Sequence, residues 1–430
     1  MIFRFLMLAI ASCVAASIIL HPPIAHAQSD IDAAQVELRE AFAAYNAKDY
    51  EAFVISVKKA LALNQHSIAT RYYLARGYAL TGQIDQALEV LGYLVSRNID
   101  YGYAEHRDFE SLRGDPRFAR LITELAERTS PVINGLHRYT IDQLGIIPEG
   151  IAHDAATNRL FLSSMRTGDI YVLDADNSLS LFATVKDAQP MAAIGLFADS
   201  ERHLLWAVGA TFEMTRGFDP DAETQTGVFG FDLTDGTLQK KILAGDVATF
   251  FNDLTVAADG RIYLSGSDLC VIEPHSDTIE RLPVEPHITG SNGVTATPDG
   301  KFLFVSSYPV GVYAIELETG QARLLELPAN ASLYGIDGMY VRGGSLVAVQ
   351  NGIEPWRLVH IELDENFGAV TGIQVLEFGN PDIGPTTGAL DGDVIHLVGQ
   401  GPAPESAPGH FPGNLREFLG KTVIYSVPVD

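Results

Sequence analysis

The spacing of apolar residues changes near residue 130. From Asp30 to about Arg128 apolar residues recur at spacings of three and four residues. Gly is sparse there, and Ala, Leu, Glu and Lys dominate, which predicts helices. After Pro131 apolar and polar positions alternate, and Gly, Asp-Gly steps and β-branched or aromatic residues become common, which predicts short strands joined by turns. The pattern therefore predicts a helical domain over 30–130 followed by an all-β domain over 138–430.

The helical segment contains an internal repeat. Three apolar positions recur at an offset of 34 residues, which is the period of tetratricopeptide repeats. The aligned pairs are Phe53 with Ala87, Val57 with Leu91, and Ala60 with Leu94. A further stretch, DPRFARLITELAER, predicts a closing helix. A module of this kind either binds a protein partner or packs on its neighbour as a scaffold, and both interpretations remain open.

The all-β segment repeats in larger units. Each unit has an apolar strand, an Asp or Asn turn, an aromatic strand and two further strands, over roughly 40 residues, which is typical of propeller blades. Six units begin near Pro148, Met191, Phe251, Ser291, Tyr334 and Pro385. The stretch LHRYTIDQL precedes the first unit and predicts the outer strand of the last blade, which closes the ring. We therefore expect a six-bladed β-propeller.

Oxygen-bearing side chains recur where four of the predicted inner strands begin. Because inner strands line the central channel of a propeller, their first residues meet at one mouth although they lie far apart in sequence. These positions hold Glu149, Asn252, Asn292 and Asp337. Carboxylates packed together repel one another and lose hydration, and a hard cation with its preference for oxygen ligands relieves both costs. The recurrence of oxygen-bearing side chains at the same position of four predicted strands therefore predicts a metal site.

These motifs resemble a known family. Residues 145 to 427, through PEGIAHD, NDLTVAADGRIYLSG, SNGVTATPDGKFLFVSS and IDGMYV, are similar to the senescence marker protein and gluconolactonase family of six-bladed propellers. The resemblance implies one divalent cation on Glu149, Asn292 and Asp337, with Asn252 as a fourth ligand or a substrate contact. Ca²⁺ is the expected ion, with Mg²⁺, Mn²⁺ and Zn²⁺ open. Phe250 stands where family members often carry a substrate-binding Arg, which favours a more apolar substrate than a sugar acid lactone.

The chemistry expected of this site is hydrolysis of lactones or related esters. A divalent ion polarises a carbonyl and acidifies a bound water, and Asp337 is the candidate acceptor of the water's proton. His287, four residues before Ser291, is a candidate substrate contact near the mouth. The alternative is a non-catalytic propeller stiffened by a structural cation, which binds a small ligand or a protein through the mouth or the helical repeats.

Three inserts are expected at the same mouth. They lie between second and third strands, which return to the end where the inner strands start, and they predict a rim that sets selectivity. Their sequences are TFEMTRGFDPDAETQT (211–226), NGIEPWR and GPAPESAPGHFPGNLREFLG.

The first residues predict export. Arg4 precedes an apolar run from Phe5 to Leu20, and Ala25-His26-Ala27 before Gln28 is a small-x-small cleavage site, so 1–27 is interpreted as a signal peptide. A membrane anchor and a lipoprotein box ending at Cys13 are the alternatives. Cleavage would place the chain in the periplasm or outside the cell.

The composition of the chain argues against some classes of binding partner. The chain has 2 Cys, and removal of the signal leaves Cys270 alone, which reads as a buried apolar side chain and allows no intrachain disulfide. The formal charge of −25 argues against nucleic acid and anionic membranes as partners. No later segment is long and apolar enough to predict a membrane span.

Overall fold

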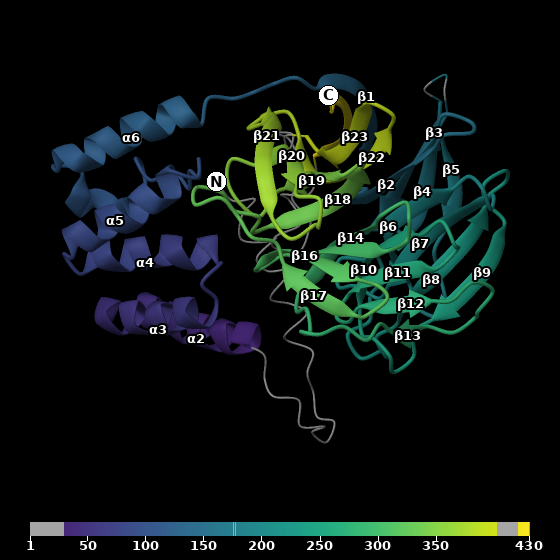
Figure 1. Ribbon diagram of the computed structural model, residues 1–430, viewed down its shortest axis with the longest axis horizontal. Coiled ribbons are helices and arrows are strands. Elements are labelled where there is room, and N and C mark those ends of the chain that lie inside the picture. The colour runs from purple at the N-terminus through teal and green to yellow at the C-terminus, as the bar shows by residue number, and fades with distance from the viewer. Residues whose placement is uncertain (1–29, 175, 177, 402–419, 430) are drawn as a thin grey trace.

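The computed structural model describes residues 30–174, 176, 178–401 and 420–429. The predicted signal peptide over 1–27 lies outside the described residues. The first part of the chain is helical, as expected from its pattern, and its helices lie beside one another on one side of the strands (Figure 1). They are α2 (Asp30–Asn46), α3 (Tyr50–Leu63), α4 (Ile68–Leu80), α5 (Ile84–Val95), the 3₁₀ helix η1 (Arg107–Leu112) and α6 (Pro116–Arg128). Their assignment to tetratricopeptide repeats stays a prediction.

Side-chain caps set where these helices begin. Asp49 accepts a hydrogen bond from the backbone N–H of Ala52, and Ser67 accepts one from Thr70, so each supplies a partner that the first helical turn lacks. Helix α4 is buried along almost its whole length and carries much of the core of the helical module.

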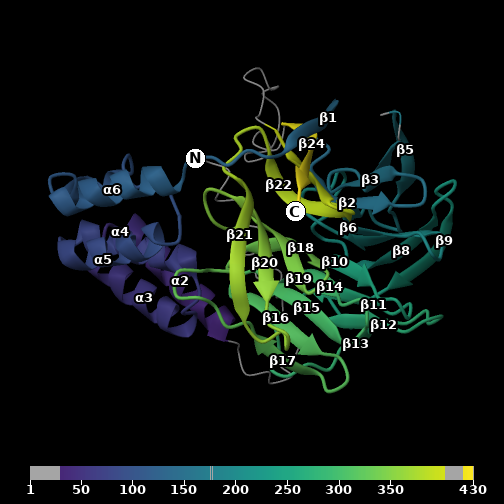
Figure 2. The same cartoon turned by 45° about the horizontal axis from the view of Figure 1, so that its top comes forward.

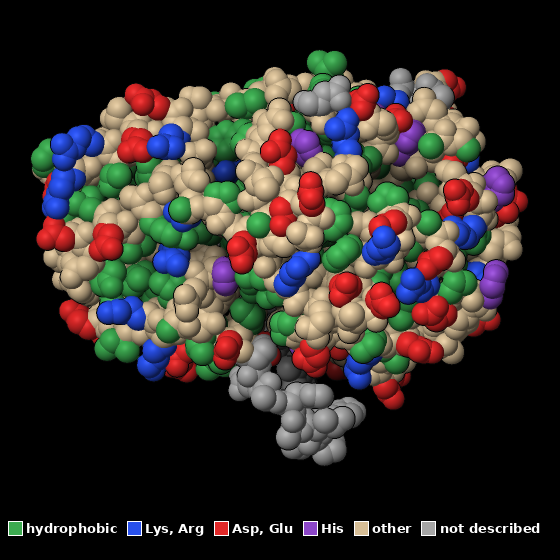
Figure 3. Space-filling model, viewed as in Figure 1, with side chains coloured by type: hydrophobic (Ala, Val, Ile, Leu, Met, Phe, Trp, Pro, Cys, Tyr) green, Lys and Arg blue, Asp and Glu red, His purple; other side chains and the backbone are tan. Residues whose placement is uncertain are grey.

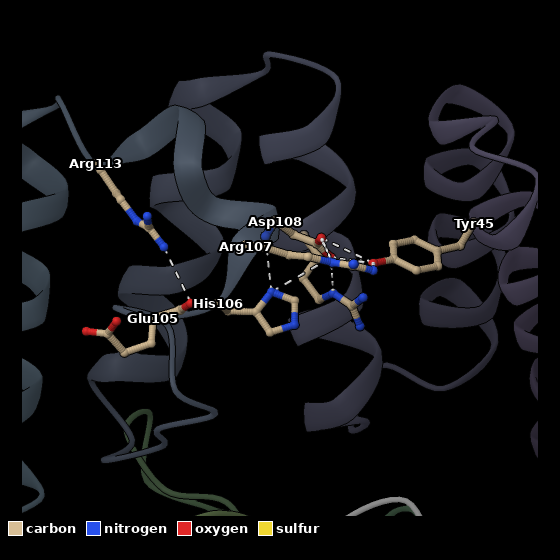
Figure 4. Close-up of polar contacts among 7 residues, drawn as sticks. Tyr45, Glu105, His106, Arg107, Asp108 and Arg113 are labelled. Atoms are coloured by element: carbon tan, nitrogen blue, oxygen red, sulfur yellow. Dashed lines mark hydrogen bonds and ion pairs between the residues drawn. The ribbon is translucent and has the colours of Figure 1, made fainter. Parts of the chain in front are cut away.

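A buried ion pair joins α4 to η1. Arg76 Nε lies 2.7 Å from Asp108 Oδ2, and the Tyr45 hydroxyl, from α2, donates to the same carboxylate at 3.0 Å (Figure 4). Because both charged groups are buried and hydrogen-bonded, removal of one partner would leave the other charge uncompensated. The pair therefore fixes η1 against the first helices.

After the helices, the described residues form six four-stranded antiparallel sheets, which confirms the six-bladed β-propeller. Blades 1 to 3 contain β2 (Pro148–Asp154), β3 (Arg159–Ser164), β4 (Asp169–Leu173), β5 (Leu179–Thr184), β6 (Ala192–Asp199), β7 (Leu204–Ala210), β8 (Thr226–Asp232), β9 (Leu238–Leu243), β10 (Phe251–Val256), β11 (Ile262–Gly266), β12 (Cys270–Ile272) and β13 (Glu280–Arg281). Blades 4 to 6 contain β14 (Ser291–Ala296), β15 (Phe302–Ser307), β16 (Gly311–Glu316), β17 (Gln321–Leu324), β18 (Ile336–Arg342), β19 (Ser345–Gln350), β20 (Arg357–Leu363), β21 (Val370–Phe378), β22 (Gly384–Asp391), β23 (Val394–Gln400), β24 (Lys421–Pro428) and β1 (Leu136–Leu144).

The ring closes as the sequence predicts. Strand β1, which precedes the first blade in sequence, pairs antiparallel with β24 and completes the sheet β1-β24-β23-β22. The last blade is thus built from both ends of the propeller segment, and this strand pairing closes the ring.

The propeller core lies between neighbouring blades. Each of its buried apolar clusters draws residues from two adjacent sheets, as where Phe304 of blade 4 packs with Met339 and Leu346 of blade 5. Cys270 is fully buried in one such cluster, as expected, and burial raises the pKa of its thiol to about 12. Since every blade is held by both neighbours, the strand ends around the axis keep fixed relative positions.

The helical module packs against blades 4 and 5 (Figures 1 and 2). The Asn64 side chain donates to the carbonyl of Pro309 at 2.8 Å, and the backbone N–H of Asp100 donates to the carbonyl of Glu354 at 2.6 Å. Buried Arg357 at the start of β20 donates to the carbonyl of Asn98 at 2.9 Å. These contacts fall on loops at the end of the propeller where the inner strands begin.

The surface is mixed in charge. On the face in Figure 3, acidic and basic side chains are interspersed rather than gathered by sign. Within the described part of the chain, no helix combines the length and apolar character needed to cross a membrane.

Candidate active site around the propeller axis

Every inner strand carries an irregularity near its first residues. Pairing with the second strand shifts register between Pro148 and Ile151 in blade 1, and the same shift recurs in the other five blades. A bulge of this kind re-aims side chains at the end of a strand. Four of the residues inside these bulges are the predicted ligands Glu149, Asn252, Asn292 and Asp337. The structure therefore places all four at one end of the axis in the same register.

Glycine follows the bulged residue in four blades. These glycines are Gly150, Gly195, Gly293 and Gly338. A Cβ atom on any of them would collide with the neighbouring blade, as on Gly293, where it would run into the backbone carbonyl of Asp337. Blade 3 instead has Asp253 at this position, so a carboxylate side chain stands where those four blades have none. The sequence pattern points to Asn252 alone of this pair, and Asp253 emerges as a site residue only in the structure.

Three carboxyl groups consequently share the axis. We call Glu149, Asp253, Asn292 and Asp337 the axial cluster. Burial raises the pKa of Glu149 well above its usual range, and the charges of Asp337 and Asp253 raise it further. Burial likewise raises the pKa of Asp253 to about 7, and the charge of Asp337 adds to the rise. Glu149 and Asp253 keep part of their surface accessible.

Asp337 is the most deeply buried member, with 1% of its surface exposed. Burial raises its pKa to about 7, and the side chains of Asn351 and Asn292 oppose the rise. Its Oδ2 accepts a hydrogen bond from Asn351 at 2.7 Å, whereas its buried Oδ1 has no hydrogen-bond partner. A buried acceptor left without a partner is costly, so this oxygen marks an incomplete site.

The donor set fits a hard divalent cation. Carboxylate oxygens of Glu149 and Asp337 and the amide oxygen of Asn292 are the ligand types that Ca²⁺ and Mg²⁺ prefer, and a cation would both neutralise the acids and occupy the free Oδ1. Among the residues that the structure describes, no group of three or more His, Cys, Asp or Glu is arranged to hold a metal ion. The proposed ligand set is of a different kind, because it combines two acids, Glu149 and Asp337, with the amide of Asn292.

The remaining predicted residues lie near or outside the cluster. Asn252 is partly exposed in the bulge of β10. Phe250 lies two residues before Asn252, and the Phe250 ring lies 6.1 Å from the ring of Phe212. His287 is exposed in the linker before β14, where its role as a substrate contact stays a prediction.

The predicted rim is described in part. The insert between β7 and β8 folds over blade 1, since Thr215 donates to the carbonyl of Met165 at 3.1 Å and Met214 is buried. The insert between β19 and β20 contacts the helical module through Glu354. The Pro-rich insert falls on 402–419, outside the described residues.

A separate hollow lies away from the axis. It has a volume of about 450 Å³ and is lined by His66, Tyr93 and Arg97 of the helical module and by residues 310–312, 324–329 and 331–333 of the propeller. None of the axial residues lines it, so it is distinct from the axial cluster.

Comparison with known proteins gives structural neighbours alone. No family model and no curated protein matches the chain. Similar solved structures include a gluconolactonase from Xanthomonas campestris, at 15% identity over 66% of this chain and 87% of that one, with a TM-score of 0.44. A luciferin-regenerating enzyme matches at 13% identity over 70% of this chain and 95% of that one, with a TM-score of 0.45. Regucalcin from Agrobacterium tumefaciens, a calcium-binding protein, matches at 13% identity over 68% and 96%, with a TM-score of 0.43.

One of these neighbours, the gluconolactonase, bears the name of the family that the sequence motifs resemble. Identities and scores this low leave the function to be decided by the residues of the site.

Proposed function

We propose that this chain is a divalent-metal-dependent hydrolase of lactones or related esters and that the axial cluster is its active site. The observation that carries the proposal is Asp337: a buried carboxylate with one oxygen hydrogen-bonded and the other unpartnered, among two further acids. Such an arrangement suits a group that binds a cation and exchanges a proton.

Glu149, Asn292 and Asp337 would hold the cation, with Asn252 as a fourth oxygen donor or a substrate contact. When bound, the cation supplies a Lewis acid for the substrate carbonyl and makes a nearby water more acidic. Asn351 holds Oδ2 of Asp337, and Oδ1 has two lone pairs, so this oxygen could both bind the cation and accept the proton of the attacking water. In the metal-free chain Asp253 also holds a proton near neutral pH, since burial raises its pKa to about 7.

The substrate is expected to carry an apolar part. Phe250, two residues before Asn252, stands where the resemblance leads one to expect an Arg, and its ring lies 6.1 Å from the ring of Phe212. Aromatic faces contribute contact area to apolar groups but offer no charge to a sugar acid. Aliphatic lactones and aryl esters are therefore the first compounds to test.

The test is hydrolysis of a lactone and ester panel by the full chain with Ca²⁺, Mg²⁺, Mn²⁺ or Zn²⁺ added after chelation. We expect activity to require a cation and to fall about 100-fold or more in Asp337→Asn. The control is Asp142→Asn, since Asp142 is exposed on β1 and pairs with Lys421. A cation-replete protein that hydrolyses none of the panel, or an Asp337→Asn variant as active as the wild type, would overturn the proposal.

A binding protein with a structural cation is the second candidate. The hollow of about 450 Å³ between the helical module and the propeller favours it, because ligand sites are common at domain interfaces. A thermal-shift screen of small organic acids separates the two. Stabilisation that is lost in Arg97→Ala and kept in Asp337→Asn would support this candidate, and the reverse pattern would support catalysis.

Export to the periplasm or beyond the cell is part of the proposal. It rests on the apolar run and on Ala25-His26-Ala27 before Gln28. Mass spectrometry of the mature protein should find an N-terminus at Gln28. An intact Met1 would exclude cleavage.

A further inference from the structure

Asn351 lies beside Asp337 and is held on three sides. It follows β19 directly, and its Nδ2 donates to Asp337 Oδ2 at 2.7 Å and to the backbone carbonyl of Pro385 at 3.1 Å. Its Oδ1 accepts a hydrogen bond from the Tyr308 hydroxyl at 3.1 Å. Both amide hydrogens and the amide oxygen are thus in use. Because the tyrosine hydroxyl occupies Oδ1, the NH₂ group must face Asp337.

This amide decides which oxygen of Asp337 is free. With Oδ2 fixed by Asn351, the carboxylate plane is set and Oδ1 is left without a hydrogen bond. Without the Tyr308 hydroxyl the Asn351 amide would be able to turn over and present its oxygen to Asp337, which would repel the carboxylate.

Tyr308 is itself held by its surroundings. Gly352 leaves room for the phenol, because a Cβ atom there would lie 3.0 Å from the tyrosine hydroxyl oxygen. The Tyr308 backbone carbonyl accepts a hydrogen bond from Gly335 at 2.8 Å, and its ring lies 6.4 Å from that of Tyr334.

The same segment is where the helical module docks. Asn64 donates to the carbonyl of Pro309, the residue after Tyr308. Tyr334 and Ile353, which flank Tyr308 and Asn351, belong to the apolar cluster of the module. The module therefore packs directly behind the chain of hydrogen bonds that ends at Asp337.

We propose that Asn351 and Tyr308 are positioning residues for Asp337, and that the docked helical module keeps them in place. The inference rests on the proposed function and deepens it: it gives the helical module a part in building the site. Side chains that orient the ligands of a metal change its affinity and the reaction rate by about 10–100-fold when removed.

The test compares Tyr308→Phe, Asn351→Ala, Tyr334→Phe and Tyr313→Phe in the full chain. Tyr334→Phe probes the docked module, because the Tyr334 hydroxyl hydrogen-bonds Ser67 of the helical module. The matched control is Tyr313→Phe, which removes the hydroxyl of a blade 4 tyrosine that packs in the apolar cluster shared with blade 3. Thermal unfolding of each variant checks folding. The readouts are Ca²⁺ affinity by calorimetry without substrate, and kcat and KM on the best substrate of the panel.

We expect Asn351→Ala to weaken Ca²⁺ binding and lower kcat by about 10–100-fold, with KM changed much less. Tyr308→Phe and Tyr334→Phe should shift both quantities in the same direction by a smaller factor, and Tyr313→Phe should leave them unchanged. If wild type binds Ca²⁺ and turns over substrate while Tyr308→Phe and Tyr313→Phe are indistinguishable, the positioning role is wrong and the proposed function stands. A wild type that neither binds a cation nor hydrolyses the panel overturns both.

Discussion

Glu149 and Asp337 are the second residues of the inner strands of blades 1 and 5, and the charge of Asp337 raises the pKa of Glu149. Asp253 from blade 3 acts on Glu149 in the same way. Acids that interact this strongly release their protons as a group. In the absence of a cation the axial cluster therefore retains protons at a pH where isolated carboxyl groups are ionised.

The stability of the metal-free protein should depend on pH because of these acids. Asp253 and Asp337 have a pKa of about 7 in the folded chain, against about 3.9 for Asp in an unfolded chain. Between these values the folded state holds protons that the unfolded state has released, so the free energy of unfolding falls as pH rises from about 4 to about 7. It stays at the lower value above that range.

Urea unfolding in chelator at pH 5 and pH 8 measures this effect. Asp253→Asn should be more stable than wild type at pH 8 and should show a smaller loss of stability between the two pH values. The amide oxygen of Asn still accepts the Leu254 N–H that Asp253 now accepts at 2.8 Å, so the local structure is kept. A variant with the same pH dependence as wild type would contradict the assignment of raised pKa values to this cluster.

Gly293 should tolerate no side chain. Since a Cβ atom there would collide with the backbone carbonyl of Asp337, Gly293→Ala should displace the inner strand of blade 5 and cost about 1–3 kcal/mol of stability. Gly344→Ala is the control, because nothing lies within 4 Å of a Cβ at that position. Thermal unfolding and the Ca²⁺ affinity of both variants check this, and equal behaviour of the two would show that the blades do not approach so closely.

Arg357 should anchor the helical module. It is buried, and its guanidinium donates to the carbonyls of Arg97 and Asn98 and lies 5.1 Å from the ring of Phe378. Burial lowers its pKa to about 10, so it remains charged at pH 7.

Arg357→Met keeps the apolar stem but leaves the two carbonyls unpaired, which should cost about 1–3 kcal/mol. Arg261→Met is the control, since Arg261 pairs with nearby Asp259 at a partly exposed position. Limited proteolysis should cut between the helical module and the propeller faster in Arg357→Met alone. Equal cleavage of both variants would mean that docking depends on other contacts.

Repetition made the ring predictable from sequence. Pro148, Phe251 and Ser291 were recognisable as strand starts because each precedes an apolar strand and an Asp or Asn turn at a similar spacing. Glu149, Asn292 and Asp337 are candidate ligands for the same reason, since they occupy one register. The closing strand before blade 1 followed from the need to pair the free edge of the last blade.

The rest of the site lies outside that register. Asp253 was detectable in principle, because four other blades have Gly at its position, but the close approach that requires Gly appears only when neighbouring blades are seen together. Asn351 and Tyr308 follow second strands, and no repeat marks them. Their connection to Asp337, and the docking of the helical module behind them, depend on contacts between blades that sequence spacing does not encode.

Equilibrium dialysis against Ca²⁺ measures whether the axial cluster holds one divalent cation. The wild-type chain, freed of metal by chelation, should bind about one ion per chain at neutral pH, since its ligands form a single set at one end of the axis. The double variant Glu149→Gln, Asp337→Asn should bind none, and Asp142→Asn should bind as wild type does. Binding of no ion by the folded wild type, or of an equal amount by the double variant, would contradict the account.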